Sequence, residues 1–368
     1  MGGLARRAST IDTFRQPNQG LVILDSGDSL AQRNMAIHQS IEALRPKAGT
    51  MIRAMGLMGT DAMVPGENEL ATGVTWLAEE AGHAGLPLLA ANLKPNKGKN
   101  PFKARKLVKA GAVNVGIFGL VDLAGEPEEI QELMKKSGVR VKPALAAGKA
   151  QIKALRKAGA EVIVLLAHMP HETLKKLLAQ LKGVHLAIQG HPGMRLGEPM
   201  KVGETYLLEA GRRGMELGHV VLSLGPDWTV ADSKPLVDDS RKYVVYQRIS
   251  MQIGVLKQLL TTVDPGQAPP ATAVELNKSI LGMLKDYNEM RSSSAPHTLA
   301  VNMIPLNDKV ANHPAVDALI KGQAAAMDPP AGATSAPAQP AMIQVDKRVR
   351  ISDEEIRKLE QKAQDEAR

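Results

Sequence analysis

Short apolar runs alternate with longer amphipathic stretches along most of this chain, and this pattern predicts strands that alternate with helices. The predicted strands cover residues 21–24, 86–92, 113–120, 161–167, 184–189, 206–209 and 217–224. The predicted helices cover residues 34–44, 48–57, 69–81, 127–136, 144–158 and 172–181. Continuous apolar strands between helices are typical of sheets whose outer faces are covered by helices. The pattern therefore predicts one α/β domain over residues 1–233.

The pattern changes after residue 233, where strand-like runs no longer alternate with helices. Amphipathic helices are predicted over residues 241–260 and 273–290, so residues 234–323 are expected to form a helical extension. Residues 324–349 are rich in Ala and Pro, which predicts a disordered linker without a core. Residues 350–368 are expected to form a charged helix that Ser352 caps. These C-terminal helices are the expected surface for a protein partner.

The charge balance is basic but does not by itself indicate nucleic acid. The formal net charge is +8, yet only 2 Trp, 4 Tyr and 3 Phe are available to stack on bases. Lys103, Arg105, Lys106 and Lys109 are interpreted as the solvated face of a helical stretch. The absence of Cys excludes thiolate ligands and thiol catalysis within these residues. No apolar run reaches the ~18 residues of a membrane span, and residues 1–7 lack the pattern of a signal peptide.

Polar side chains follow predicted strands at three points and open a helix at a fourth. Asp28, His168 and His191 each come shortly after a strand, and Glu67 begins a helical stretch. In open α/β sheets, ligands bind beyond the carboxyl ends of strands, so these residues are expected to converge. Two imidazoles and two carboxylates suit Zn, Mn or Fe. Each residue also has a structural interpretation, because Asp caps turns, Glu favours helix N-termini and His often only forms hydrogen bonds.

Six short motifs occur in a fixed order between residues 24 and 191. They are Leu24-Asp-Ser-Gly-Asp28, Pro65-Gly-Glu-Asn-Glu-Leu-Ala-Thr-Gly73, Leu88-Leu-Ala-Ala-Asn92, Val115-Gly-Ile-Phe-Gly119, Val164-Leu-Leu-Ala-His168 and Gln189-Gly-His191. Each motif is short, but the ordered set resembles the 5′-nucleotidase (UshA-like) branch of the calcineurin-like metallophosphoesterases. The resemblance covers about residues 2–225. It implies a four-layer αββα sandwich, followed here by a C-terminal helical extension.

The resemblance also implies a two-metal site of which one half is retained. Asp28 matches the carboxylate that both metals of the family share, and Glu67 stands where the family has an Asn ligand. His168 and His191 match the two His ligands of the second metal. The ligands unique to the first metal are absent, and Gly193 occupies one of their positions. Asn68 replaces the catalytic His of the family, so the resemblance implies one divalent metal (Zn, Mn or Fe) in a weakened site.

The function that the resemblance implies is metal-dependent hydrolysis of a phosphoester, with nucleotides as the expected substrate class. Asn92 and Arg212 are weaker candidates for substrate contact, since Asn92 equally suits a turn and Arg212 a surface loop. The alternative is a non-catalytic binding or scaffold domain of the cell envelope that retains the fold. A true start upstream of Met1, with a first metal motif that includes Cys or selenocysteine, would imply export to the periplasm.

Overall fold

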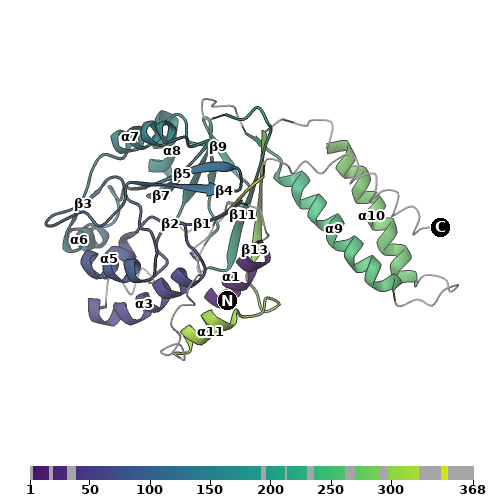
Figure 1. Ribbon diagram of the computed structural model, residues 1–368, viewed down its shortest axis with the longest axis horizontal. Helices are drawn as coiled ribbons and strands as arrows, with labels where there is room; N and C mark the ends of the chain where they lie inside the picture. Colours follow the sequence, from purple (N-terminus) through teal and green to yellow (C-terminus); the bar gives the residue numbers. More distant parts are fainter. Residues whose placement is uncertain are drawn as a thin grey trace.

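The computed structural model describes residues 3–15, 20–30, 39–191, 196–211, 214–229, 236–261, 270–290, 295, 297–322 and 341–346. Two β-sheets face each other with helices outside them, and two long helices stand beside this body (Figure 1). The helices are α1 (Leu4–Thr13), α3 (Ile41–Leu57), α4 (Glu67–Leu70), α5 (Val74–His83), α6 (Glu128–Lys136), α7 (Ala144–Lys157), α8 (His171–Gln180), α9 (Ser240–Leu260), α10 (Ala271–Met290) and α11 (Pro314–Ile320). The strands are β1 (Gly20–Asp25), β2 (Ala62–Met63), β3 (Leu93–Pro95), β4 (Arg105–Ala110), β5 (Val113–Val121), β6 (Val139–Val141), β7 (Val162–His168), β8 (Leu186–Gln189), β9 (Met200–Val202), β10 (Thr205–Leu208), β11 (Glu216–Leu224), β12 (Val237–Asp238), β13 (His297–Pro305) and β14 (Ala341–Asp346).

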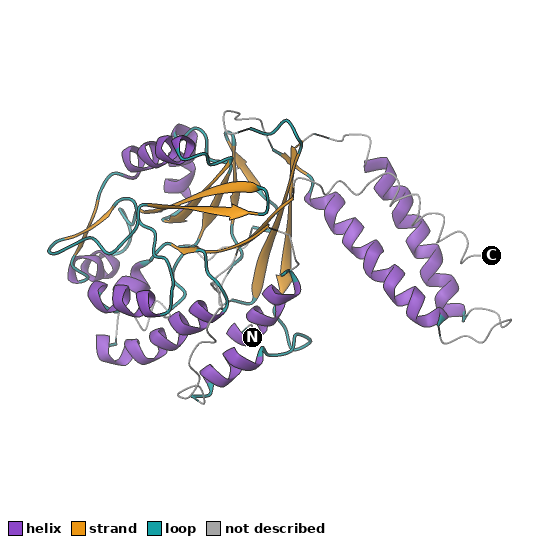
Figure 2. Ribbon diagram, in the orientation of Figure 1, coloured by secondary structure: helices purple, strands orange, loops and turns teal. Residues whose placement is uncertain are grey.

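The two large sheets, orange in Figure 2, differ in how their strands run. The first has the order β12-β13-β11-β14-β1-β2 and mixes parallel with antiparallel neighbours. The second has the order β4-β5-β7-β8-β10-β9, in which β5, β7, β8 and β10 run parallel. Its edge strands β4 and β9 run antiparallel to their neighbours. β3 and β6 form a separate two-stranded sheet.

Alternate side chains of β7 point to opposite faces of its sheet and so contribute to two different cores. Val164 and Leu166 belong to the core between the sheets, whereas Ile163 and Leu165 pack in a second core that includes α7 and α8. On the far side of the first sheet, Ile23 of β1 packs with α1, α3 and α11. The layers therefore run helix, sheet, sheet, helix. This order confirms the predicted α/β class and the four-layer αββα sandwich.

Three predicted elements of the N-terminal half have different bounds or a different type in the structure. Residues 48–57 belong to the single helix α3, which begins at Ile41 and continues past Pro46 because its apolar face is buried. Residues 31–38, where another helix was predicted to begin, lie outside the described part. The predicted helix 69–81 is divided into α4 and α5 by Gly73, whose φ is +91°. The predicted strand 86–92 contributes only isolated bridges at Leu88 and Leu89.

The basic stretch that was interpreted as a helix face is the edge strand β4, so that prediction is wrong. Arg105 and Lys109 are exposed, whereas Lys106 and Val108 between them are partly buried. Side chains two residues apart share one face of a strand, so the charged ends reach solvent while the strand pairs with β5. The short helix α1 was not predicted.

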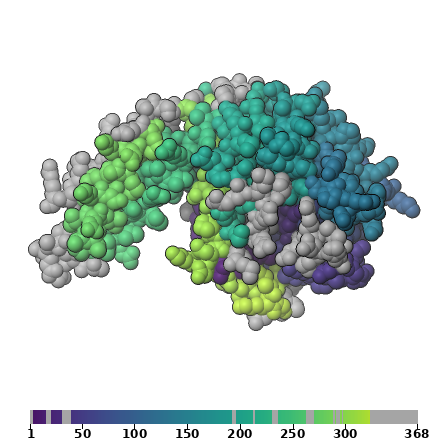
Figure 3. All heavy atoms as spheres, turned by 180° about the vertical axis from the view of Figure 1, so that it is seen from behind, coloured from purple at the N-terminus to yellow at the C-terminus, as the bar shows by residue number. Residues whose placement is uncertain are grey.

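The C-terminal region contains the two predicted helices and also strands of the first sheet. α9 and α10 pack together through their own apolar cluster and form the green lobe beside the body in Figure 3. β13 pairs with β11 from His297 to Pro305, so residues 234–323 are not wholly helical. β14 lies between β1 and β11, so the linker prediction is wrong for residues 341–346. Residues 324–340 and the predicted helix 350–368 lie outside the described part.

Among the helices that the structure describes, none combines the length and the hydropathy that crossing a bilayer requires.

Candidate metal centre

The loop after β1 turns sharply and directs Asp28 toward the other polar residues. Asp25 ends the strand, and its Oδ1 accepts the backbone N–H of Gly27 at 2.7 Å. Gly27 and Asp28 both have positive φ, +88° and +60°. Gly reaches this region without strain, and Asp is among the few other residues that enter it readily. The Asp-Ser-Gly-Asp motif is therefore suited to this turn.

A buried carboxylate, Glu69, joins this loop to the start of α4. It accepts four backbone N–H groups at 2.7–2.9 Å, those of Asp28, Ser29, Leu30 and Gly66. The same carboxylate thus orders the Asp28 loop and caps the helix that carries Glu67. The hydrogen bonds from residues 28–30 to Glu69 span about 40 residues of sequence. No local sequence pattern indicates them, so the sequence analysis did not predict this role.

Each of the two His rings is oriented by a second group. His168 ends β7, and its Nδ1 lies 2.8 Å from the carbonyl oxygen of Ser26. This carbonyl can only accept, so Nδ1 carries a proton and Nε2 faces the cluster. His191 follows β8, and its Nε2 lies 3.1 Å from Oε1 of Glu126, which leaves Nδ1 facing the cluster. Carboxylates and carbonyls that hold the outer nitrogen are common around metal-bound His.

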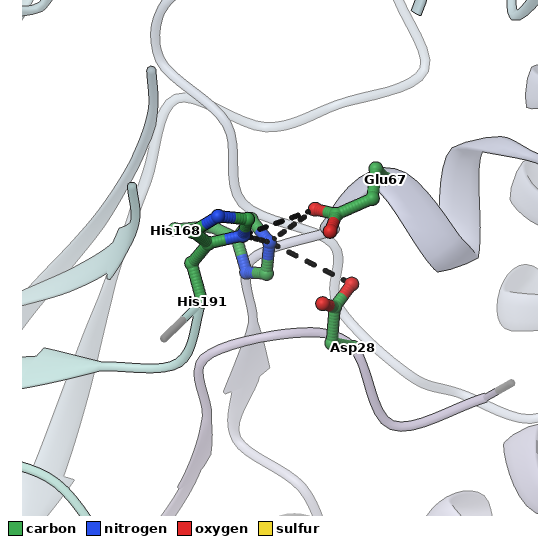
Figure 4. Close-up of side chains that lie close together, drawn as sticks. All are labelled: Asp28, Glu67, His168 and His191. Atoms are coloured by element: carbon green, nitrogen blue, oxygen red, sulfur yellow. Dashed lines mark hydrogen bonds and ion pairs between the residues drawn. The ribbon is translucent and has the colours of Figure 1, made fainter. Parts of the chain in front are cut away.

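The four residues predicted from strand ends meet in one group (Figure 4). Their ligand atoms all lie within 4.8 Å of one another. Oε2 of Glu67 is 2.7 Å from Nε2 of His168 and 3.3 Å from Nδ1 of His191. Oδ1 of Asp28 is 3.6 Å from Nε2 of His168. Donors around a tetrahedral metal with bonds of about 2.1 Å lie about 3.4 Å apart, so the spacing and the donor types fit a divalent metal.

Two glycines allow the segments of this group to approach closely. A Cβ on Gly66 would lie 2.4 Å from Cε1 of His168 and 2.5 Å from Oδ1 of Asp28. A Cβ on Gly190 would lie 2.0 Å from the carbonyl oxygen of Ser26. No side chain fits at these distances. The glycines that flank Glu67 and His191 in the sequence motifs are therefore required by the geometry of the cluster.

The charged side chains of the cluster shift one another's pKa values. Burial disfavours a charged His168, but the carboxylates of Asp28 and Glu67 outweigh burial and raise the pKa of His168 to about 10. Burial acts against ionisation of Glu67 too, yet His168 and His191 hold the pKa of that carboxyl far below its usual range. Burial and the neighbouring Glu67 raise the pKa of Asp28 well above its ordinary value, against the effect of His168. The carboxylates of Asp28 and Glu67 thus favour the charged form of His168.

Asn68 lies at the edge of the cluster, beside Asp28. Its backbone N–H donates to Oδ1 of Asp28 at 3.2 Å. Its side chain is buried, and the amide Oδ1 has no hydrogen-bond partner among the described residues. An unpaired buried amide oxygen is unusual and is often explained by a bound molecule. The amide can orient such a molecule but cannot give it a proton as an acid.

Of the two weaker candidates for substrate contact, Asn92 lies outside this group. Asn92 is fully buried, and its Nδ2 donates to the carbonyl oxygens of Val121 and Lys142 at 2.6 and 2.9 Å. Its Oδ1 accepts the Val121 N–H at 3.0 Å, so the side chain binds the end of β5 to the end of β6. In the structure the side chain of Asn92 therefore makes structural contacts with the backbone. Arg212 and Gly193 lie outside the described residues.

Comparison with known proteins finds similarity to phosphoesterases. It is 26% identical over 208 residues to a snake venom 5′-nucleotidase from Gloydius brevicauda, covering 52% of this chain and 32% of that protein. It is 26% identical over 217 residues to the trifunctional nucleotide phosphoesterase YfkN of Bacillus subtilis, covering 51% of this chain and 14% of that protein. The 2′,3′-cyclic-nucleotide 2′-phosphodiesterase/3′-nucleotidase of Salmonella typhimurium is 24% identical over an alignment of 297 residues that covers 69% of this chain and 45% of that protein. No family model matches the chain.

The fold agrees with these relations. The structure of the sulfate thiohydrolase SoxB from Thermus thermophilus superposes with a TM-score of 0.55 at 16% identity, over 88% of this chain and 47% of that one. The chain is thus related to 5′-nucleotidases and calcineurin-like phosphoesterases and has the metallophosphoesterase fold, which confirms the resemblance. It spans less than half the length of each of these relatives.

Proposed function

We propose that this protein is a phosphoester hydrolase that uses one divalent metal held by Asp28, Glu67, His168 and His191. The observation that carries the proposal is the convergence of two carboxylates and two oriented imidazoles from four separate segments of the chain. The phosphoesterase names of the relatives support the reaction class. Nucleotides are the proposed substrates, because the relatives are named for them.

The protein side chains have distinct parts in the proposed reaction. When bound, a divalent metal would supply a Lewis acid for a phosphoryl oxygen and would promote the ionisation of water. His168 and His191 offer neutral nitrogens, because Ser26 and Glu126 hold their outer nitrogens. Asp28 and Glu67 offset the charge of the cation. Asn68 lies beside Asp28, and the Nδ2 of its amide is the atom that would donate to an oxygen of the phosphoester.

The proposed site is weakened at Asn68, in the first turn of α4, because its side chain is an amide where an acid would promote departure of the leaving group. Proton donation to a leaving group contributes about 10²–10⁴-fold in enzymes that have a positioned acid. Asn68 has no acidic proton, so the leaving oxygen would have to depart without help from this position. The proposed enzyme therefore favours phosphoesters with acidic leaving groups, such as nitrophenyl esters, over nucleotides with alkyl leaving groups.

The metal count and the location are further parts of the proposal. The described residues contain one group with metal-ligand spacing, formed by Asp28, Glu67, His168 and His191. This supports a mononuclear site for Zn, Mn or Fe. The periplasm or cell envelope is the proposed location, in line with a relative found in venom.

A second candidate function is non-catalytic binding of a phosphoester in the cell envelope, and Asn68 favours it. Both functions need the same ligand set, but only hydrolysis needs protonation of a leaving group. The Nδ2 of the buried amide would then hold the ligand without promoting its cleavage. Helices α9 and α10 would be the surface for a protein partner in this role.

The test is metal content and hydrolysis measured on one preparation. Purified protein is stripped with a chelator, reloaded with Zn, Mn or Fe, and analysed by mass spectrometry for metal. Hydrolysis of nitrophenyl phosphate, bis-nitrophenyl phosphate and adenosine monophosphate is then followed. We expect one metal per chain and metal-dependent hydrolysis, both lost in His168→Ala and His191→Ala. The exposed His83→Ala is the matched control and retains both.

The outcomes separate the two candidates. Metal binding without hydrolysis of any of the three esters supports the binding protein and rejects the hydrolase. No metal in the wild-type protein, or equal metal content in His168→Ala, rejects both.

A further inference from the structure

One face of the molecule is built from two segments that contain no acidic residue. Residues 94–121 and 133–160 together hold 15 Lys and Arg and no Asp or Glu. These segments form β3 to β6 and α7; α7 contacts β4 and β5, and β3 contacts β6. Residues 94–182 as a whole carry 18 basic and 7 acidic residues, a formal charge of +11 against +8 for the entire chain. The basic balance of the protein is therefore concentrated here.

The cations of α7 and β4 lie on the same side of the second sheet. Nη1 of Arg105 reaches Oε1 of Gln151 on α7 at 2.7 Å, so the outward side of β4 and the helix lie together. Lys106, on the other side of β4, instead pairs with Asp61 at 3.5 Å. Lys149, Lys153 and Lys157 follow one another at four-residue spacing along α7 and are exposed. Side chains four apart share one face of a helix.

The two-stranded sheet β3–β6 carries further cations and is joined to the end of β5 through the side chain of Asn92. Lys94 lies directly opposite Arg140 in the register, and Lys142 follows the strand. Like charges placed opposite each other destabilise a strand pair. We call the following residues the basic face: Lys94, Lys97, Lys99, Lys103, Arg105, Lys109, Arg140, Lys142, Lys149, Lys153, Arg156 and Lys157. In the described part of the chain, none of them forms an ion pair with a carboxylate, unlike Lys106, Lys135 and Lys175 nearby.

An apolar side chain stands between the cations of β4. Leu107 lies between Arg105 and Lys109 on the outward side of β4 and is 40% exposed. Surfaces that combine Lys and Arg with exposed aliphatic side chains suit the headgroup layer of an anionic bilayer. The face exposes no aromatic side chain, whereas binding of single-stranded nucleic acid relies on aromatic stacking.

We infer that the basic face docks the protein on the surface of an anionic phospholipid bilayer. Unpaired like charges repel one another in the free protein, and lipid headgroups of opposite charge relieve that repulsion. Leu107 enters the headgroup region between the cations of β4. This docking uses residues outside the Asp28 cluster and does not depend on the proposed hydrolysis.

Vesicle sedimentation of the full chain tests the docking. The vesicles contain phosphatidylcholine alone or mixed with phosphatidylglycerol. We expect binding to the mixed vesicles only, with release at about 1 M NaCl, where the Debye length falls to about 3 Å. The triple variant Lys149→Gln, Lys153→Gln, Lys157→Gln should bind about 10- to 100-fold more weakly, since each surface cation contributes severalfold.

A matched variant separates local docking from net charge. Lys257→Gln, Lys278→Gln, Lys285→Gln changes the charge by the same amount on the exposed sides of α9 and α10. It should bind the mixed vesicles within about twofold of the wild type. Equal loss in both triple variants, or no binding by the wild type, overturns the inference. All three lysines of each set are exposed, and circular dichroism establishes that both variants fold.

The Leu107→Gln variant separates a bilayer from other polyanions. It keeps every charge, so binding to a DNA duplex should not change, whereas vesicle binding should fall about threefold or more as aliphatic contact is lost. If Leu107→Gln leaves vesicle binding unchanged and the α7 variant loses only duplex binding, the face is a nucleic-acid surface and the bilayer inference is rejected.

Discussion

Oε1 of Glu126 lies 3.1 Å from Nε2 of His191, on the side of the ring that faces away from Glu67. The contact determines which nitrogen of His191 meets the metal-ligand group. Glu126 comes from the loop before α6, a segment that contributes no ligand itself. The ligand geometry therefore depends on a residue outside the group of four.

Removing this contact should weaken metal binding. Glu126→Ala frees the His191 ring to rotate, and we expect a loss of about 10- to 100-fold in metal affinity by titration calorimetry, the usual effect of losing such a partner. Glu126→Gln retains an acceptor oxygen and should lose less. The exposed Glu128→Ala, two residues along, is the control. Unchanged affinity in Glu126→Ala would show that His191 is oriented by other groups.

Metal binding should release protons because His168 is held in its charged form. Asp28 and Glu67 outweigh burial and raise the pKa of His168 to about 10, so at neutral pH a metal must displace that proton. Calorimetry in buffers of different ionisation enthalpy should give about one proton or more released per metal, because the raised pKa of Asp28 adds to the release from His168. Affinity should rise with pH up to the pKa of His168, by as much as about tenfold per unit. A reaction without proton release would contradict the protonated state of His168.

Restoring an acid beside the cluster should change the choice of substrate. Asn68→His places an imidazole next to Asp28, and a positioned acid contributes about 10²–10⁴-fold where the leaving group needs a proton. We expect hydrolysis of adenosine monophosphate to increase by at least about tenfold, with a smaller change for nitrophenyl phosphate. Asn68→Gln, which keeps an amide, is the control. Equal change for both esters would indicate an effect on metal binding instead of proton donation.

The four metal-ligand candidates were predictable because each lies at the end of an apolar run or at the start of a helix in the sequence. Asp28, His168 and His191 each follow a short apolar run. The parallel pairing of β7 with β8 brings His168 and His191 together, and Asp28 follows β1 of the facing sheet. Glu67 follows Gly66, the helix N-cap. Glu69 and Glu126 were not predictable in their roles, because each acts on backbone or ring atoms far away in the sequence. A carboxylate in a first helical turn or a loop can cap a helix, accept hydrogen bonds or face solvent, and its role depends on which distant residues the fold brings near it.

The fold was predictable where burial on both faces gives a strand a continuous apolar run, as in β7. It was not predictable in β4, whose exposed alternate residues fit a solvated helix equally well. The pairing of β13 and β14 with β11 joins segments separated by about 70 residues or more in the sequence. Such long-range pairing leaves no trace in local periodicity.

Acidification should destabilise the protein through His185. Its Nδ1 accepts the N–H of Ile163 at 2.9 Å, and Nε2 is buried without a hydrogen-bond partner. Burial, with a smaller effect of Arg156, lowers the pKa of His185 to about 4 from its usual 6.5. Between these values the unfolded chain binds a proton that the folded chain excludes, so the free energy of unfolding falls as the pH drops from 6.5 to about 4. The full loss is about 3 kcal/mol.

His185→Asn isolates this contribution, because its amide oxygen can accept the Ile163 N–H and does not titrate in this range. Urea unfolding at neutral pH and near pH 4.5 should show a smaller acid loss in the variant, by about 2 kcal/mol. The exposed His83→Asn serves as the control and should lose as much stability as the wild type. Other groups that titrate in this interval, such as Asp25, affect all three proteins alike and cancel in the comparison. Equal acid loss in wild type and His185→Asn would show that His185 is protonated inside the fold, with the Ile163 contact broken.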